Sequence, residues 1–77
     1  MGTTSDKVRE IIAMVQACSV EQIAPDAVLA DLGVDSLDRI EVAILIEEEF
    51  HIAIDDEKAF ALVTVRDLVE LVDGMTA

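Results

Sequence analysis

The sequence predicts an all-α fold, a small antiparallel four-helix bundle with three long helices and one short helix. First, apolar residues recur at helical spacing in three stretches, residues 6–17, 36–50 and those after Thr64. Second, the only stretch that alternates like a strand, residues 51–54, has no second strand to pair with, so we expect an extended linker there. Third, 77 residues that are 53% hydrophobic can build one small core, which predicts a single domain over residues 1–77.

The first helix is predicted over residues 6–17, with Ser5 as its N-cap. It should bury the stripe formed by Val8, Ile11, Ile12 and Val15. A second capping pattern follows at Ser19 and Gln22, and Pro25 then interrupts regular structure. Over residues 24–34 we expect a long connection with one helical turn, pinned by Val28, Leu29 and Leu32. Connections of this length are typically functional or packed on themselves.

The second helix is predicted over residues 36–50. Its apolar sector should consist of Ile40, Ala43, Ile44, Ile46 and Phe50, and its opposite side of Asp38, Glu41, Glu48 and Glu49 together with Leu45. Arg39 falls near Ile46 and Phe50, within the apolar sector. Its guanidinium must therefore reach solvent along its stem or find a carboxylate.

The remaining elements are a short third helix and a last long helix. Asp55, Asp56 and Glu57 can begin the third helix, which we expect to continue through residue 62. Thr64, with Asp67 three residues on, precedes the last helix, and Gly74 is a candidate C-terminal stop. The buried stripe of this helix should consist of Val65, Leu68, Val69 and Val72.

Charge and composition exclude several classes of function. The formal net charge of −12 repels nucleic acid and anionic membranes and favours basic partners. No stretch approaches the roughly 20 apolar residues of a membrane span. Cys18 is the only cysteine, which fits a reducing compartment, so we expect a cytoplasmic protein. We also expect it to be a monomer. No EF-hand spacing is present, and we expect no metal site; Cys18 should be a small hydrophobe and His51 a helix-end residue.

The segment from Gly33 to Leu37 is the best candidate for a functional site. It places Ser36 where a Gly-bearing loop gives way to a helix, and a helix start stabilises an attached phosphate. On its own, Ser36 could equally be an ordinary N-cap or first-turn serine. No His, Lys or Cys lies within a turn of Ser36 to act as a general base, so Ser36 should not be an autonomous nucleophile. A chain of 77 residues is also too small for the deep cleft of most enzymes, and we expect a protein that is not an enzyme.

The segment from Leu32 to Asp38 and its surroundings resemble the acyl carrier proteins. The likeness extends to the Pro25-Asp26 loop, the acidic run ending at Phe50, and Thr64-Val65. It implies that Ser36 carries 4′-phosphopantetheine, transferred from coenzyme A by a phosphopantetheinyl transferase with Mg²⁺, and that Asp35 helps to place the metal. The arm would carry acyl intermediates as thioesters among fatty acid synthesis enzymes. A specialised carrier for polyketide, lipid-anchor or aminoacyl chemistry is the alternative within this class.

The acidic side chains of the second helix allow two interpretations. They could form a solvated face, or they could form the surface that basic patches of synthase enzymes recognise, as the resemblance implies. The residues concerned are Asp35, Asp38, Glu41, Glu47, Glu48 and Glu49. Leu37 and Ile44 could be apolar anchors on that surface or core residues. An unmodified acidic helical module that only binds a basic partner is the alternative of another class.

Two further features concern the cargo. The core is built from aliphatic side chains, which on their own could simply be a small core of small residues. The resemblance implies more, because in the family such helices part to admit an acyl chain. Arg39 departs from the family pattern, in which a small or uncharged residue commonly follows Asp-Ser-Leu-Asp. This departure can be interpreted as neutral drift compensated by repacking, or as the sign of a carrier tuned to a subset of partners or cargo.

Overall fold

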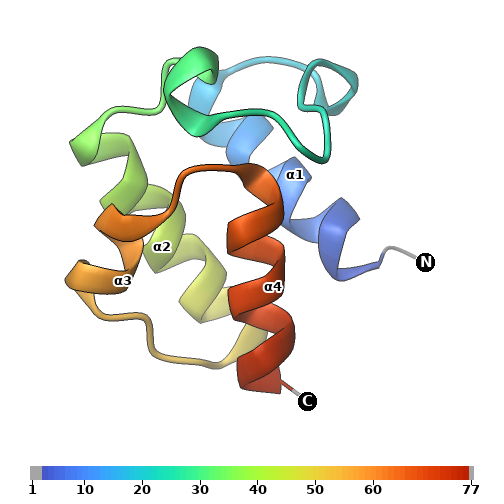
Figure 1. The fold of residues 1–77 in the computed structure, drawn as a ribbon. Coiled ribbons are helices and arrows are strands. Elements are labelled where there is room, and N and C mark those ends of the chain that lie inside the picture. The colour runs from blue at the N-terminus through green and yellow to red at the C-terminus, as the bar shows by residue number, and fades with distance from the viewer. Residues whose placement is uncertain (1–2, 77) are drawn as a thin grey trace.

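Residues 3–76 are described by this computed structural model, and they form helices joined by loops, without a strand (Figure 1). The elements are α1 (Thr4–Gln16), the 3₁₀ turns η1 (Val20–Gln22) and η2 (Leu29–Leu32), α2 (Ser36–Phe50), α3 (Asp56–Ala61) and α4 (Val65–Thr76). The predicted all-α class, with three long helices and one short helix, is confirmed. The predicted domain ends at residues 1 and 77 lie outside the described range.

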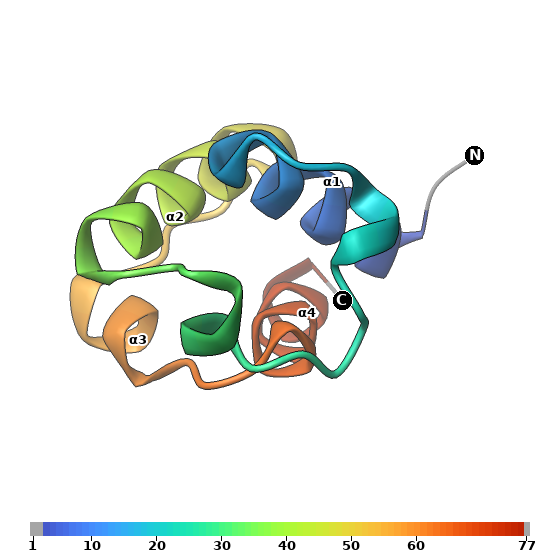
Figure 2. The ribbon, with the colours of Figure 1, turned by 90° about the horizontal axis from the view of Figure 1, so that it is seen from above.

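The helices surround one aliphatic core (Figure 2). α1 packs against both α2 and α4, and α3 packs against α2. α1 and α2 run in opposite directions, and the connection that contains η1 and η2 passes over one end of the bundle (Figure 1). The side chains that are almost fully buried are Ile12, Ile23, Ile46, Leu68, Val8, Val65 and Val72. The core therefore draws on α1, α2, α4 and the connection.

The N-cap of α1 is Thr3, so the prediction of Ser5 is wrong. The backbone N–H of Asp6 donates to Thr3 Oγ1 at 3.1 Å, and the N–H of Thr3 donates to Asp6 Oδ2 at 3.3 Å. Ser5 and Thr3 are both good capping residues, but only Thr3 has a carboxylate three residues on, because that position after Ser5 is Val8. The reciprocal capping box decides where the helix begins.

The buried face of α2 differs from the predicted sector. The buried residues are Val42, Ala43 and Ile46, whereas Ile44 is 48% exposed and Leu45 is partly buried against the core. Residues 42–46 are all apolar, so their periodicity cannot choose which of them face inward. Packing decides it, since α2 lies between α1 and α3. The predicted helix limits are confirmed, and His51 ends the helix in the left-handed conformation at φ 56°.

The last two helices follow the predicted order. Asp55 caps α3 by accepting the N–H of Lys58 at 2.9 Å. Before α4, Thr64 Oγ1 accepts the N–H of Asp67 at 3.1 Å, and Asp67 accepts the N–H of Thr64 at 3.0 Å. The predicted stop at Gly74 is wrong, because α4 continues to Thr76. Gly74 lies within α4 and has no positive φ.

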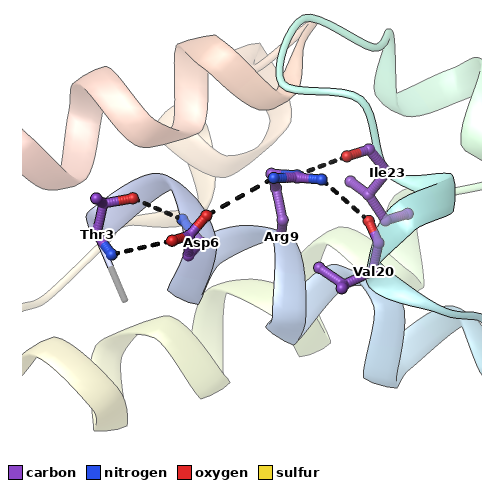
Figure 3. A network of polar contacts seen from close by, with 5 residues as sticks. All are labelled: Thr3, Asp6, Arg9, Val20 and Ile23. Atoms are coloured by element: carbon purple, nitrogen blue, oxygen red, sulfur yellow. Dashed lines mark hydrogen bonds and ion pairs between the residues drawn. The ribbon is translucent and has the colours of Figure 1, made fainter. Parts of the chain in front are cut away.

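The long connection is fixed by hydrogen bonds to the helices. Arg9 of α1 donates from Nε to the carbonyl of Ile23 at 2.6 Å and from Nη2 to that of Val20 at 3.2 Å (Figure 3). The N–H of Leu29 donates to the carbonyl of Val63 at 2.8 Å, beside an antiparallel bridge between residues 28 and 64. The predicted turn forms at η2, with Leu29 buried. Cys18 is partly buried against the core, as predicted for a small hydrophobe.

Candidate functional site

Ser36 is the first residue of α2, and its neighbour Asp35 takes the capping role. The N–H of Asp38 donates to Asp35 Oδ1 at 2.9 Å, and the N–H of Asp35 donates to Asp38 Oδ2 at 3.4 Å. Within residues 3–76 the Ser36 hydroxyl has no hydrogen-bond partner, and the residue is exposed. Its hydroxyl is therefore accessible at a helix start, beside unpaired backbone N–H groups that favour a phosphate.

The loop before Ser36 is held in one conformation by α1. Gln16 donates from Nε2 to the carbonyl of Leu32 at 2.8 Å. Gly33 follows in the left-handed conformation at φ 82°, which favours glycine. Val34 is then buried, and its N–H donates to the carbonyl of Leu29 at 3.1 Å. The backbone is thus anchored two residues before Ser36, while the serine itself lies outside the core.

Beyond Ser36, one exposed stripe follows the outer face of α2. Residues spaced three or four apart lie in line along a helix. This spacing joins Leu37, Glu41, Ile44 and Glu48. Leu37 is 76% exposed and Ile44 is 48% exposed, which excludes core packing for both. We refer to these four residues as the outer stripe. It combines two apolar side chains with two carboxylates and ends next to the Ser36 hydroxyl.

Two of the other acidic residues predicted for this surface, Asp38 and Glu47, make internal contacts. Asp38 is half-buried and belongs to the capping box. Glu47 is half-buried, and its Oε2 accepts the N–H of Ile54 at 2.8 Å. No pattern in the sequence signals this bond, because its partners are seven residues apart in different segments. Glu49 is exposed, and together with Glu48 it lines a depression beside Met14 of α1.

Arg39 is half-buried, and its guanidinium contacts backbone carbonyls and not the carboxylate that the sequence suggested as a partner. Its Nη1 lies 3.3 Å from the carbonyl oxygen of Ala59 and 3.5 Å from that of Phe60, and it also donates to the carbonyl of Leu62. These carbonyls lie at the C-terminal end of α3, where backbone oxygens lack helical partners. A side chain of α2 therefore caps the end of the next helix.

An apolar cavity lies behind Arg39. Its volume is about 10 Å³, and it is lined by Leu29, Val34, Arg39, Val42, Ala43, Ile54, Leu62 and Leu68. A cavity of this size holds about one water molecule at most. Two of its lining residues, Val34 and Arg39, lie two residues before and three residues after Ser36 in the sequence.

The electrostatics of the described residues are dominated by uncompensated carboxylates. Within residues 3–76 the only ion pair shorter than 4 Å joins Arg9 and Asp6, at 3.7 Å. In the same range no three His, Cys, Asp or Glu side chains are grouped so as to hold a metal ion. The pKa of Asp67 is lowered, chiefly by the hydrogen bond from the Thr64 N–H and then by that from the Val63 N–H. Among the described residues, none of the helices has the length and apolar character needed to span a bilayer.

Comparison with known proteins identifies the family. Residues 6–72 match the family model described as phosphopantetheine attachment site. The chain is 38% identical over 73 residues to the acyl carrier protein of Thermosynechococcus vestitus, a match that covers 94% of this chain and 90% of that protein. It is 39% identical over 73 residues to the chloroplastic acyl carrier protein of Brassica napus, where the match spans about half of the relative, 54% of its length.

A solved structure agrees with the sequence comparisons. The crystal structure of an acyl carrier protein from Thermotoga maritima superposes with a TM-score of 0.78 at 29% identity, over 90% of this chain and 81% of that chain. The chain belongs to the acyl carrier proteins, which carry acyl groups on phosphopantetheine and are not themselves catalysts. Members of the family are modified by a phosphopantetheinyl transferase and interact with synthase enzymes. The predicted family, carrier function and cofactor are confirmed.

Proposed function

We propose that Ser36 is the residue to which 4′-phosphopantetheine is attached. The observation that carries this proposal is the exposed hydroxyl at the first position of α2, left without an internal partner because Asp35 is the cap. A phosphodiester formed there would lie at the positive end of the helix macrodipole. The bound arm supplies a thiol on which acyl groups are carried as thioesters.

The neighbours of Ser36 suit an external catalyst. Asp35 uses Oδ1 in the capping box. Its other oxygen, Oδ2, accepts no hydrogen bond within residues 3–76 and can face a Mg²⁺ ion held by the transferase. Ser36 has no general base in its own helical turn, so activation of its hydroxyl falls to the transferase. Residues 1–77 would act as one carrier domain, because both the site and its anchors, Gln16 and Val34, belong to the same bundle.

The outer stripe of α2 is proposed as the surface that partner enzymes recognise. Leu37 and Ile44 supply exposed apolar anchors, and Glu41 and Glu48 supply charges that attract basic patches. Asp38 and Glu47 border the stripe and contribute charge, although their oxygens also make internal bonds. Charges of this kind raise the rate of association more than the affinity, which suits the short encounters of a shuttle.

Fatty acid synthesis is the proposed pathway, since it is the usual role of such carriers. We place the protein in the cytoplasm as a monomer, with its exposed acidic surface as the support for the monomeric state. A specialised carrier is the second candidate within the family, and the observation that favours it is the arginine at position 39, which lines the cavity and contacts a carbonyl of α3.

The attachment residue is tested by incubation with coenzyme A and a transferase, followed by intact-mass measurement. Wild-type protein should gain the mass of one phosphopantetheine group, and Ser36→Ala should gain none while its helical content stays unchanged. Ser19→Ala is the matched control, because it removes another exposed serine at the start of a helical turn. Full modification of the Ser36→Ala variant would refute the assignment. A wild-type chain that is never modified would favour the unmodified binding module.

The same reaction tests the outer stripe. Glu41→Lys should lower the kcat/KM of the transferase several-fold at low salt, because it reverses a charge in the middle of the stripe, and the deficit should shrink as salt screens the encounter. Glu70→Lys makes the same change of net charge on the exposed face of α4. Equal loss in both variants would show that only net charge matters and would remove the stripe as a specific surface.

A further inference from the structure

The end of α3 depends on a side chain from another helix. α3 has six residues, and its C-cap Leu62 is extended at φ −68° and ψ 135°, so the left-handed turn that commonly satisfies the last carbonyls of a helix is missing. Arg39 replaces that turn, because its Nη1 group lies within hydrogen-bond distance of the carbonyls of Ala59, Phe60 and Leu62. Its positive charge also lies at the negative end of the helix dipole.

α3 has few other attachments. A helix of six residues is not stable on its own, and Ala59 is its only buried residue. The linker before it is held by Glu47 of α2, which accepts the N–H of Ile54 at 2.8 Å. Two side chains of α2 therefore fasten the α3 segment, Glu47 before it begins and Arg39 where it ends.

The segment that Arg39 fastens forms one wall of the apolar cavity. Ile54 and Leu62, which flank α3, line it together with Val42 and Ala43 of α2 and Leu68 of α4. At about 10 Å³ the cavity is too small for a hydrocarbon chain, so such a chain can enter only if a wall moves. The wall that contains Ile54 and Leu62 flanks α3, a helix with a single buried residue, and displacing the end of α3 requires Arg39 Nη1 to leave the backbone carbonyls that it contacts.

We propose that Arg39 is a specificity-determining residue that holds α3 closed over the cavity and so sets the length of hydrocarbon cargo at which the chain enters the protein. The proposal rests on the proposed function, since the cargo arm begins at Ser36. Each methylene group that enters gains hydrophobic free energy, whereas breaking hydrogen bonds from a charged donor has a fixed cost. Short or polar acyl groups therefore stay outside, and the threshold for entry shifts to chains about two to four methylenes longer than without Arg39.

The test compares wild type with Arg39→Met, which keeps an apolar stem along the cavity and removes the donors, and with Arg39→Lys, which keeps the charge and one donor group. Each holo-protein is loaded with saturated acyl chains of increasing length. Amide hydrogen exchange is then measured over α3 and at Val42 and Leu68. In the unloaded proteins, the amide exchange rates of Arg39→Met should be higher than those of wild type over α3 and equal to them over α1 and α4. In the loaded series, cavity residues should respond at shorter chains in Arg39→Met than in wild type, with Arg39→Lys between them.

Identical thresholds in the three proteins would overturn the role of Arg39. So would unchanged exchange over α3 in Arg39→Met. If that variant does not fold, Arg39→Lys against wild type gives the same comparison over a smaller shift. Failure of wild type to accept any acyl-phosphopantetheine would count against Ser36 and not against Arg39. In that case, free fatty acids of the same lengths are added to the unmodified proteins, and the chain length at which the cavity residues respond is measured with them.

Discussion

Glycine-to-alanine substitutions at positions 33 and 74 should change stability in opposite directions. Gly33 lies at φ 82° in the loop that positions Ser36, and a Cβ there would lie 3.3 Å from Gln16 Nε2. Gly74 lies inside α4, where a Cβ would meet no atom within 4 Å. The same chemical change therefore tests a strained position and a relaxed one within one small protein.

The cost at position 33 has two parts. An alanine in the left-handed region costs about 1 kcal/mol. The close contact adds roughly 0.5 kcal/mol, because the Gln16 amide must move by a few tenths of an ångström and so weaken its 2.8 Å bond to the Leu32 carbonyl. The sum of about 1.5 kcal/mol corresponds to a fall in Tm of roughly 6–12 °C for a domain of this size. At position 74 alanine should stabilise by about 0.5 kcal/mol, a rise of roughly 2–4 °C.

Thermal unfolding followed by far-ultraviolet circular dichroism measures both shifts, and the double variant Gln16→Ala/Gly33→Ala separates the two parts. In the Gln16→Ala background the contact is gone, so Gly33→Ala should cost only the backbone strain. A Gly33→Ala protein as stable as wild type would refute the left-handed conformation before Ser36. A loss at Gly74 equal to that at Gly33 would show that α4 does not continue through residue 74.

Two further predictions concern charge. The Tm should rise with added NaCl, and Mg²⁺ or Ca²⁺ should raise it at lower concentrations than NaCl does. The reason is that ion pairs scarcely compensate the net charge of −12, so that added cations screen the repulsion. A Tm that does not change with ionic strength would contradict this. Asp67→Asn should destabilise at neutral pH more than Asp73→Asn, which removes the same charge from an exposed position of α4. Folding lowers the pKa of Asp67, so the charged carboxylate stabilises the fold at pH values above its unfolded pKa of about 3.9. This stabilisation is lost as the pH falls through the pKa of Asp67 in the folded protein. The two variants should therefore have the same stability in acid.

The sequence predicted the elements well where the signal was local. The α2 limits, the linker before α3 and the Thr64–Asp67 start of α4 depend on neighbouring residues, and the structure confirms all three. The N-cap of α1 was mispredicted although its signal was also local. Thr3 and Ser5 both qualify as caps, and the partner three residues on, Asp6 against Val8, should have distinguished them.

The sequence could not predict contacts between distant segments. Arg39 and its carbonyl partners are 20 to 23 residues apart, and backbone oxygens carry no side-chain signature, so a carboxylate was the only partner that a pattern could suggest. The same limit applies to the bond from Gln16 to Leu32 across 16 residues. For α2, the uninterrupted apolar residues 42–46 left the buried face undetermined until the positions of α1 and α3 were known.

These distant contacts give α2 two functions that share one helix. Its outer stripe faces solvent, while Arg39 and Glu47, which lie outside the stripe, hold the α3 segment. Substitutions of α2 charges will therefore act by different routes. A change at Glu41 should alter encounter rates and their dependence on salt, whereas a change at Arg39 or Glu47 should alter exchange and opening over α3 even in the absence of a partner. Charge reversals along α2 can thus be assigned to recognition only after α3 has been shown to remain closed.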